Sequence, residues 1–121
     1  MTGDNTMTVA VKQKWQTVCR LDDLVANSGV CALVDGQQVA IFYLPGTQPQ
    51  VFALANRDPI GKANVMSRGI VGDLQGRIVV ASPLYKQHYD LATGVCLEDE
   101  QVHLDTYTVQ LQGDDVLVAR P

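Results

Sequence analysis

The side chains best suited to chemistry in this 121-residue sequence are polar groups that follow two apolar segments. Asn56 and Asp58 follow one segment, and Ser82 and Tyr85 follow a later one. Such oxygens could bind a metal or a small anion, or they could hydrogen-bond two loops to each other. Buried polar groups are normally satisfied within a protein. We therefore expect Asp58 to accept from loop amides and from Ser82, and Tyr85 to donate its hydroxyl.

The three cysteines do not form a recognisable site. Cys19, Cys31 and Cys96 are widely spaced, odd in number and without a CxxC pattern, which favours reduced thiols over a disulfide framework. We expect Cys19 and Cys31 to pack in the core. Cys96 precedes the acidic run 98–100, a predicted solvated turn that would raise the pKa of its thiol.

The histidines offer little for metal binding or catalysis. His88 and His103 are too few and too far apart to indicate a zinc site. His88 stands two residues before Asp90, a spacing that could support acid–base chemistry, but no nucleophile motif accompanies it. We expect a surface histidine.

Composition indicates one globular domain that does not bind nucleic acid. Hydrophobic residues make up 46% of the chain and charged residues 18%, which is too apolar for a disordered protein. The formal net charge is -4, and the nine Lys and Arg residues are scattered. An acidic surface without a basic patch would repel a phosphate backbone.

No segment suggests a membrane or an export signal. The longest apolar run, 39–44, ends at Pro45 and is far shorter than the roughly 20 residues of a spanning helix. The polar start lacks the basic and apolar parts of a signal peptide. We expect a flexible tail over residues 1–12, a folded domain over residues 13–121 and a cytoplasmic location.

The elements that must position these groups are short strands. Alternating, β-branched segments are separated by frequent turn signals, and no helical period is sustained. Asp35-Gly36 between two apolar runs predicts a tight hairpin. The stretches 56–76 and 82–94 show little periodicity and are interpreted as long connections. The sequence therefore predicts an all-β, antiparallel sandwich or barrel with two long loops at one end and little helix.

The two loops resemble those of Rieske iron–sulfur domains. That family has Cys-x-His in one loop and Cys-Pro-x-His in the next, followed by an aromatic-Asp-Leu-x-Thr-Gly tail. Residues 89–94 read Tyr-Asp-Leu-Ala-Thr-Gly, and Pro83 stands in the expected place. The resemblance covers nearly the whole chain from Trp15 onward and implies a Rieske-like fold.

The same comparison shows that the four cluster ligands are replaced. Asn56 and Ser82 stand where the family has cysteine, and Asp58 and Tyr85 stand where it has histidine. A Rieske centre needs two thiolates on one iron and two imidazoles on the other. The resemblance therefore implies a Rieske-like domain that has lost its cluster, with these four residues as vestigial ligand positions.

Further segments resemble the small subunits of bacterial NADH-dependent nitrite reductases. They are Asn-Arg-Asp-Pro at 56–59, Ala-Ser-Pro-Leu at 81–84, Ser-Arg-Gly at 67–69 and Cys-Leu-Glu-Asp-Glu-Gln at 96–101. The resemblance implies a cytoplasmic chain that binds no cofactor and is required by a large subunit. That large subunit carries FAD, an iron–sulfur cluster and siroheme, and the complex reduces nitrite to ammonium with NADH.

Two alternative functions, and the role of one surface, remain open from the sequence. The chain could be a Rieske-type electron-transfer ferredoxin, or a stand-alone module with a small-molecule site between the loops. Arg57, Arg68, Lys86 and Gln87 lie in or near the loops. They form either a docking patch for the large subunit or a set of scattered solvated charges.

Overall fold

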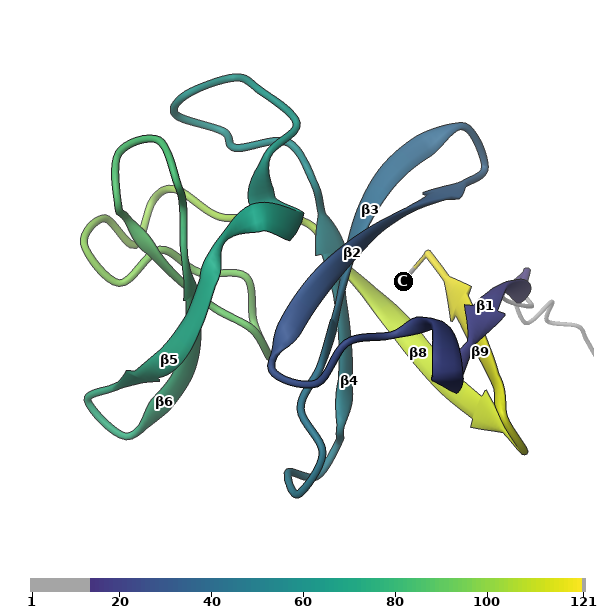
Figure 1. Ribbon diagram of the computed structural model, residues 1–121. Coiled ribbons are helices and arrows are strands. Elements are labelled where there is room, and N and C mark those ends of the chain that lie inside the picture. The colour runs from purple at the N-terminus through teal and green to yellow at the C-terminus, as the bar shows by residue number, and fades with distance from the viewer. Residues whose placement is uncertain (1–13, 121) are drawn as a thin grey trace, which may run out of the picture.

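The computed structural model describes residues 14–120, which form two antiparallel sheets (Figure 1). The larger sheet has the order β1-β9-β8-β4-β3-β2, and the smaller has the order β5-β6-β7. The strands are β1 (Gln16–Arg20), β2 (Ser28–Val34), β3 (Gln37–Tyr43), β4 (Val51–Ala55), β5 (Ile70–Leu74), β6 (Arg77–Ala81), β7 (His88–Asp90), β8 (Thr106–Gln112) and β9 (Asp115–Ala119). Two short 3-10 helices are η1 (Leu21–Asp23) and η2 (Met66–Arg68). The predicted tail, residues 1–12, lies outside the described residues.

The larger sheet curls into a barrel whose edge strands are joined by one side chain. β1 and β2 stand at opposite ends of the strand order. Gln16 on β1 donates from Nε2 to the carbonyl oxygen of Leu33 on β2 at 3.2 Å. Its Oε1 accepts from the backbone N–H of Asp35 at 3.2 Å. This bridge partly satisfies the backbone groups that an open sheet edge would leave exposed.

The hairpin between β2 and β3 confirms the prediction from Asp35-Gly36. Asp35 has φ 54° and Gly36 has φ 79°, so both central residues adopt the left-handed conformation of a type I′ turn. Val34 and Gln37 are paired across it. The turn thereby sets the register of the two strands.

The core lies on both faces of β3. Val39 and Ile41 are fully buried inside the barrel, where they belong to the same cluster as Val118 of β9. Ala40 and Phe42 point the other way, into a second cluster with side chains of the smaller sheet. Successive strand residues point to opposite faces, so a strand buried on both sides needs an unbroken apolar run.

The all-β class with little helix is confirmed, but each predicted irregular stretch contains a strand. β5 lies within 56–76 and β7 lies within 82–94. β5 is an edge strand interrupted by Gly72 and Asp73, and β7 has only three residues. Neither segment therefore shows a clear alternation of apolar and polar residues in the sequence. Pairing with β6 forms both strands. No helix among residues 14–120 is long and apolar enough to cross a membrane.

The predicted long loops are retained in shorter form. Loop 1 (56–65) follows β4, and loop 2 (82–87) connects β6 to β7. Figure 1 shows both loops, teal and green, projecting toward the top of the view, loop 1 from β4 of the larger sheet and loop 2 from the smaller sheet. The polar residues predicted to act together are thereby brought to one end of the molecule.

Candidate functional site: the two-loop junction

The junction between the loops is a buried hydrogen bond between Ser82 and Asp58. Both residues are 0% exposed. The Ser82 hydroxyl donates to Asp58 Oδ2 and accepts from the N–H of Leu84 at 3.2 Å. The other Asp58 oxygen accepts from the N–H groups of Ile60 at 2.8 Å and Gly61 at 3.0 Å. The expected bonds from loop amides and from Ser82 are thus present, and they join the loops.

The surroundings of Asp58 keep it ionised. Burial by itself would raise the pKa of this carboxyl, but hydrogen bonds from Ser82, Gly61 and Ile60 outweigh that effect and lower the pKa below its ordinary value. A carboxylate that accepts several hydrogen bonds favours its charged form. Asp58 is therefore a negatively charged hydrogen-bond acceptor that holds the backbone N–H groups of loop 1.

Asn56 belongs to a separate network. Its Oδ1 accepts from the N–H of Ser67 at 2.7 Å. Its Nδ2 donates to Gln38 Oε1 at 3.0 Å and to Cys31 Sγ at 3.5 Å. Asn56 thus fixes the start of loop 1 to β2, β3 and η2. The prediction that Cys31 is a core residue is wrong, because its side chain is exposed and contacts this polar network.

Tyr85 does not take part in the junction. Its side chain is 62% exposed, and its hydroxyl makes no hydrogen bond with residues 14–120, so the expectation that it donates there is wrong. Loop 2 turns outward at this point because Lys86 adopts φ 67°. Of the four vestigial positions, the structure joins Asp58 to Ser82, gives Asn56 different partners and leaves Tyr85 at the surface.

These residues do not fit a [2Fe–2S] cluster. The four positions supply an amide, a carboxylate, a hydroxyl and a phenol, whereas a Rieske centre needs two thiolates and two imidazoles. The Asp58 and Ser82 oxygens are already bonded to each other and to loop amides. Across residues 14–120, no group of three or more His, Cys, Asp or Glu side chains is placed to hold a metal ion.

Two buried polar atoms beside the junction lack partners. Tyr89 is fully buried, and its hydroxyl, like Gln87 Oε1, has no hydrogen-bond partner within the described part of the chain. Burial raises the pKa of Tyr89, and the negative charges of Asp58 and Glu98 add to this effect. The phenol therefore remains neutral.

The predicted histidine and cysteine environments are partly confirmed. His88 pairs with Glu98, its Nδ1 lying 2.7 Å from Oε2, while Asp90 pairs with Arg77 at 2.8 Å. Glu98 also accepts from the Cys96 thiol, Sγ to Oε1 at 3.6 Å, so the carboxylate lies between this thiol and His88. Burial raises the pKa of the Cys96 thiol, and Glu98 contributes to that rise. The direction agrees with the prediction, but burial is the larger cause. Residues 98–100 are exposed, as expected of a solvated turn.

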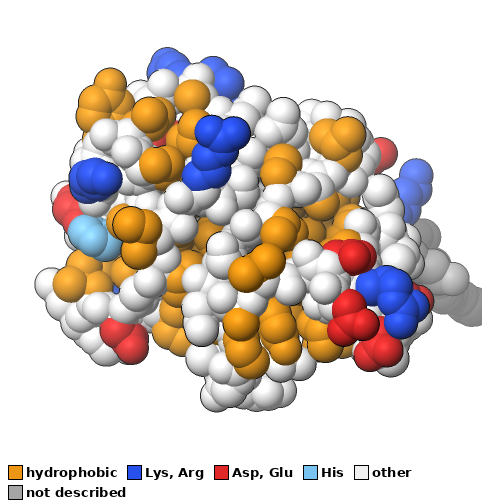
Figure 2. All heavy atoms as spheres, in the orientation of Figure 1, with side chains coloured by type: hydrophobic (Ala, Val, Ile, Leu, Met, Phe, Trp, Pro, Cys, Tyr) orange, Lys and Arg blue, Asp and Glu red, His pale blue; other side chains and the backbone are white. Residues whose placement is uncertain are grey.

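The loop tips carry an exposed surface that we call the tip patch. Ile60, Leu84 and Tyr85 are exposed large hydrophobic residues. Leu84 of loop 2 lies against Gly61 of loop 1, so a side chain at position 61 would require the Leu84 side chain to shift. The exposed cations of the patch are Arg57, Lys62, Arg68 and Lys86. Figure 2 shows orange and blue side chains mixed at the upper left, over the loop end. Gln87, also predicted for this surface, is half-buried.

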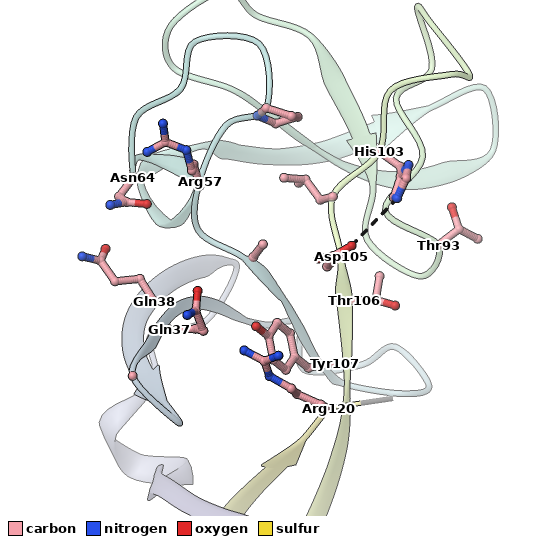
Figure 3. Close-up of a pocket in the computed structure, with 14 residues that line it drawn as sticks. Gln37, Gln38, Arg57, Asn64, Thr93, His103, Asp105, Thr106, Tyr107 and Arg120 are labelled. Atoms are coloured by element: carbon pink, nitrogen blue, oxygen red, sulfur yellow. Dashed lines mark ion pairs between the residues drawn. The ribbon is translucent and has the colours of Figure 1, made fainter.

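A separate groove lies at one rim of the barrel (Figure 3). In the antiparallel sheet, β3 and β8 start at this rim and β4 and β9 end there. The groove has a volume of about 1050 Å³ and is also lined by loop 1, but by no residue of loop 2. It is therefore not the small-molecule site between the loops that the sequence left open. We call it the rim groove.

Sequence reasoning missed most of the rim groove. Gln37, Gln38, Asn64, His103 and Arg120 line it although they are far apart in the chain. Only the strand order brings them together. The available signal was weak: polar residues stand at the ends of several predicted strands.

Together, the barrel, the small sheet and the paired loops define a Rieske-type domain in which a Ser82–Asp58 hydrogen bond joins the loops. The family described as the Rieske-like [2Fe-2S] domain matches residues 14–119. The nitrite reductase (NADH) small subunit of Salmonella typhimurium is 46% identical over 82% of this chain and 91% of its own length. The NMR structure of the Escherichia coli protein NirD has a TM-score of 0.81, with 40% identity over 89% of this chain and 97% of its own.

The chain belongs to the Rieske-like domain family and, within it, to the small subunits of NADH-dependent nitrite reductase. A further relative differs in length. The nitrite reductase [NAD(P)H] large subunit of Klebsiella oxytoca is 36% identical over 86% of this chain, but the match covers only 11% of that protein. A segment similar to this whole domain therefore forms part of a chain named as a large subunit.

Proposed function

We propose that this chain is the small subunit of a cytoplasmic enzyme that reduces nitrite to ammonium with NADH. It binds no cofactor, and FAD, an iron–sulfur cluster and siroheme reside in its large subunit. The Ser82–Asp58 junction is the observation that carries this proposal. It supports a structural role, because the loops are held by side-chain hydrogen bonds where a Rieske protein would hold its cluster.

The tip patch is the surface through which we expect the chain to dock. Segments 56–70 and 82–88 contain four exposed Lys or Arg residues and one acidic residue, Asp58, which is buried. None of these four cations forms an ion pair with an acidic side chain among residues 14–120. Because the chain as a whole has a net charge of -4, this end is electrostatically distinct. It suits an apolar partner surface with an acidic rim.

The test is an NADH-oxidation assay on a separately purified large subunit, with and without this chain. We expect nitrite-dependent turnover to rise and saturate as the chain is added, while NADH oxidation without nitrite stays low. Unchanged turnover across a full titration would contradict the proposal. A purified chain that absorbs visible light and is bleached by a reductant would favour the ferredoxin alternative instead.

A pair of matched variants tests the docking surface. Tyr85→Asp puts a negative charge in the tip patch at a side chain that is 62% exposed, and Val25→Asp does so at one that is 58% exposed before β2. We expect Tyr85→Asp to raise the concentration needed for half-maximal stimulation by about tenfold or more, since central interface residues dominate affinity. Val25→Asp should behave as wild type. Equal titration curves for the two variants would show that docking does not use the tip patch.

A further inference from the structure

The rim groove differs from the rest of the molecule in charge. Arg57, His103 and Arg120 line it, and its one acidic residue is Asp105, whose Oδ1 lies 3.8 Å from His103 Nε2. With His103 neutral, Arg57 and Arg120 against Asp105 give the groove lining a formal charge of +1, in a chain with a net charge of -4. Such a surface attracts and orients an anionic partner.

The groove also offers hydrogen-bonding groups suited to a peptide backbone. Gln37 and Asn64 contribute side-chain amides, each with a donor and an acceptor, and Gln38 contributes the donor Nε2, since its Oε1 already accepts from Asn56. Figure 3 shows Gln37 and Gln38 between Arg57 on one side and Arg120 on the other. Ten of the fourteen lining residues are polar or charged. Small-molecule sites are usually enclosed and mainly apolar, so an open polar groove suits an extended segment better.

The groove is continuous with the tip patch through loop 1. Ile60 of this loop belongs to the tip patch, Asn64 lines the groove, and Arg57 belongs to both. Gln38 further connects the groove to the loop, because its Oε1 accepts from the buried Asn56 side chain. A partner docked on the loop tips could therefore extend a segment directly into the groove.

We propose that the rim groove binds an extended acidic segment of the large subunit. The carboxylates of that segment lie at Arg57 and Arg120, and its backbone groups bond to Gln37, Gln38 and Asn64. This inference rests on the proposed function, and it adds a second contact to the tip patch. It also gives the chemistry of the recognised segment: acidic, extended and without a need for large apolar anchors.

The test measures binding of the labelled chain to the purified large subunit by fluorescence anisotropy. The double variant Arg57→Glu/Arg120→Glu reverses the charge of both groove arginines. The single variant Arg120→Glu changes only the groove, because Arg120 does not belong to the tip patch. Arg20→Glu is the matched control, because Arg20 is an exposed arginine paired with Asp114 and Asp115 at the opposite end of the β8–β9 hairpin. Thermal melting of each variant establishes that it is folded.

We expect Arg120→Glu to weaken binding by about tenfold and the double variant by more, as is typical for loss of charge-assisted contacts. Arg20→Glu should bind as wild type. Raising the salt concentration from about 50 mM to about 300 mM should weaken the wild type more than the double variant. If the groove variants bind as tightly as wild type, or if Arg20→Glu weakens binding equally, the groove proposal is wrong while the proposed function stands. If the wild type does not bind at all, the proposed function itself fails.

A second measurement locates the contact on the chain. Hexaglutamate added to the isotope-labelled chain should shift the backbone amide signals of Gln37, Gln38 and Asn64 in NMR spectra, and uncharged hexaglutamine should not. Shifts confined to loop 2, or spread evenly over all exposed lysines and arginines, would contradict a site in the groove.

Discussion

At the scale of single residues, the vestigial positions have acquired three different roles. Asp58 and Ser82 form the buried contact between the loops, Asn56 ties loop 1 to the barrel, and Tyr85 is exposed to solvent. Asp58 and Ser82 thus satisfy each other, Asn56 bonds to residues of the barrel and η2, and Tyr85 faces solvent. Each role follows from the partners that surround the side chain.

The Asp58 carboxylate should make stability depend on pH in the acid range. Its pKa is lowered in the folded protein, and the unfolded value is about 3.9. A group with a depressed folded pKa stabilises the fold above its unfolded pKa, and that stabilisation is lost as pH falls through the folded pKa. Asp58→Asn should therefore lower the free energy of unfolding at pH 7 by about 2 kcal/mol. Below about pH 4, the free energy of unfolding of the variant should depend less steeply on pH than that of the wild type.

Urea unfolding of wild type and Asp58→Asn between about pH 7 and about pH 3 measures this dependence. Asp73→Asn is the matched control, since Asp73 is an exposed residue of β5. Parallel pH curves for wild type and Asp58→Asn would contradict the role given to this carboxylate. Glu98 has a lowered pKa as well, so part of the acid limb should persist in the variant.

At the scale of elements, the connections between strands are positioned by close backbone contacts. Gly94, after β7, has φ 80°, and a side chain there would collide with the carbonyl oxygen of Leu104. The N–H of Leu104 also donates to the Gly94 carbonyl oxygen at 2.8 Å. This contact holds the long connection between β7 and β8 in place, and His103 and Asp105 of the rim groove lie on that connection.

Gly36 and Gly94 have nearly equal φ angles but different surroundings. Replacing each with alanine therefore distinguishes the cost of the backbone conformation from the cost of a steric collision. Gly36 has φ 79° but would place its added Cβ in open space, whereas Gly94 would not. Gly36→Ala should cost about 1 kcal/mol, the penalty of the left-handed conformation for a residue with a side chain. Gly94→Ala should cost that amount plus the collision, about 3 kcal/mol or more. Urea unfolding of both variants tests this, and equal losses would mean that the Gly94 contact is unimportant.

At the scale of the whole molecule, the acidic chain presents a basic end. The cations of the tip patch and of the rim groove lie on loop 1, η2, loop 2 and just after β9, whereas the chain as a whole has a net charge of -4. This asymmetry would orient the small subunit as it approaches its partner.

We expect the small and large chains to assemble in equal numbers. In the Klebsiella oxytoca large subunit, the segment similar to this chain makes up 11% of one polypeptide, which links one such domain to each large chain. Light scattering of the reconstituted complex after size-exclusion chromatography would give its mass. A mass that corresponds to unequal numbers of the two chains, at saturating small subunit, would contradict this expectation.

The sequence by itself was sufficient for the all-β class, the Asp35-Gly36 hairpin and most strand positions. These features depend on residue type and on patterns within a few neighbouring positions. It did not reveal β5 and β7, the exposure of Cys31 and Tyr85, or the separation of Asn56 from Asp58. The tertiary structure decided those features and also the rim groove, which strand order assembles from residues up to 84 positions apart, Gly36 to Arg120. Contacts between residues distant in the chain leave no periodic signal, so only the folded arrangement shows which polar groups meet.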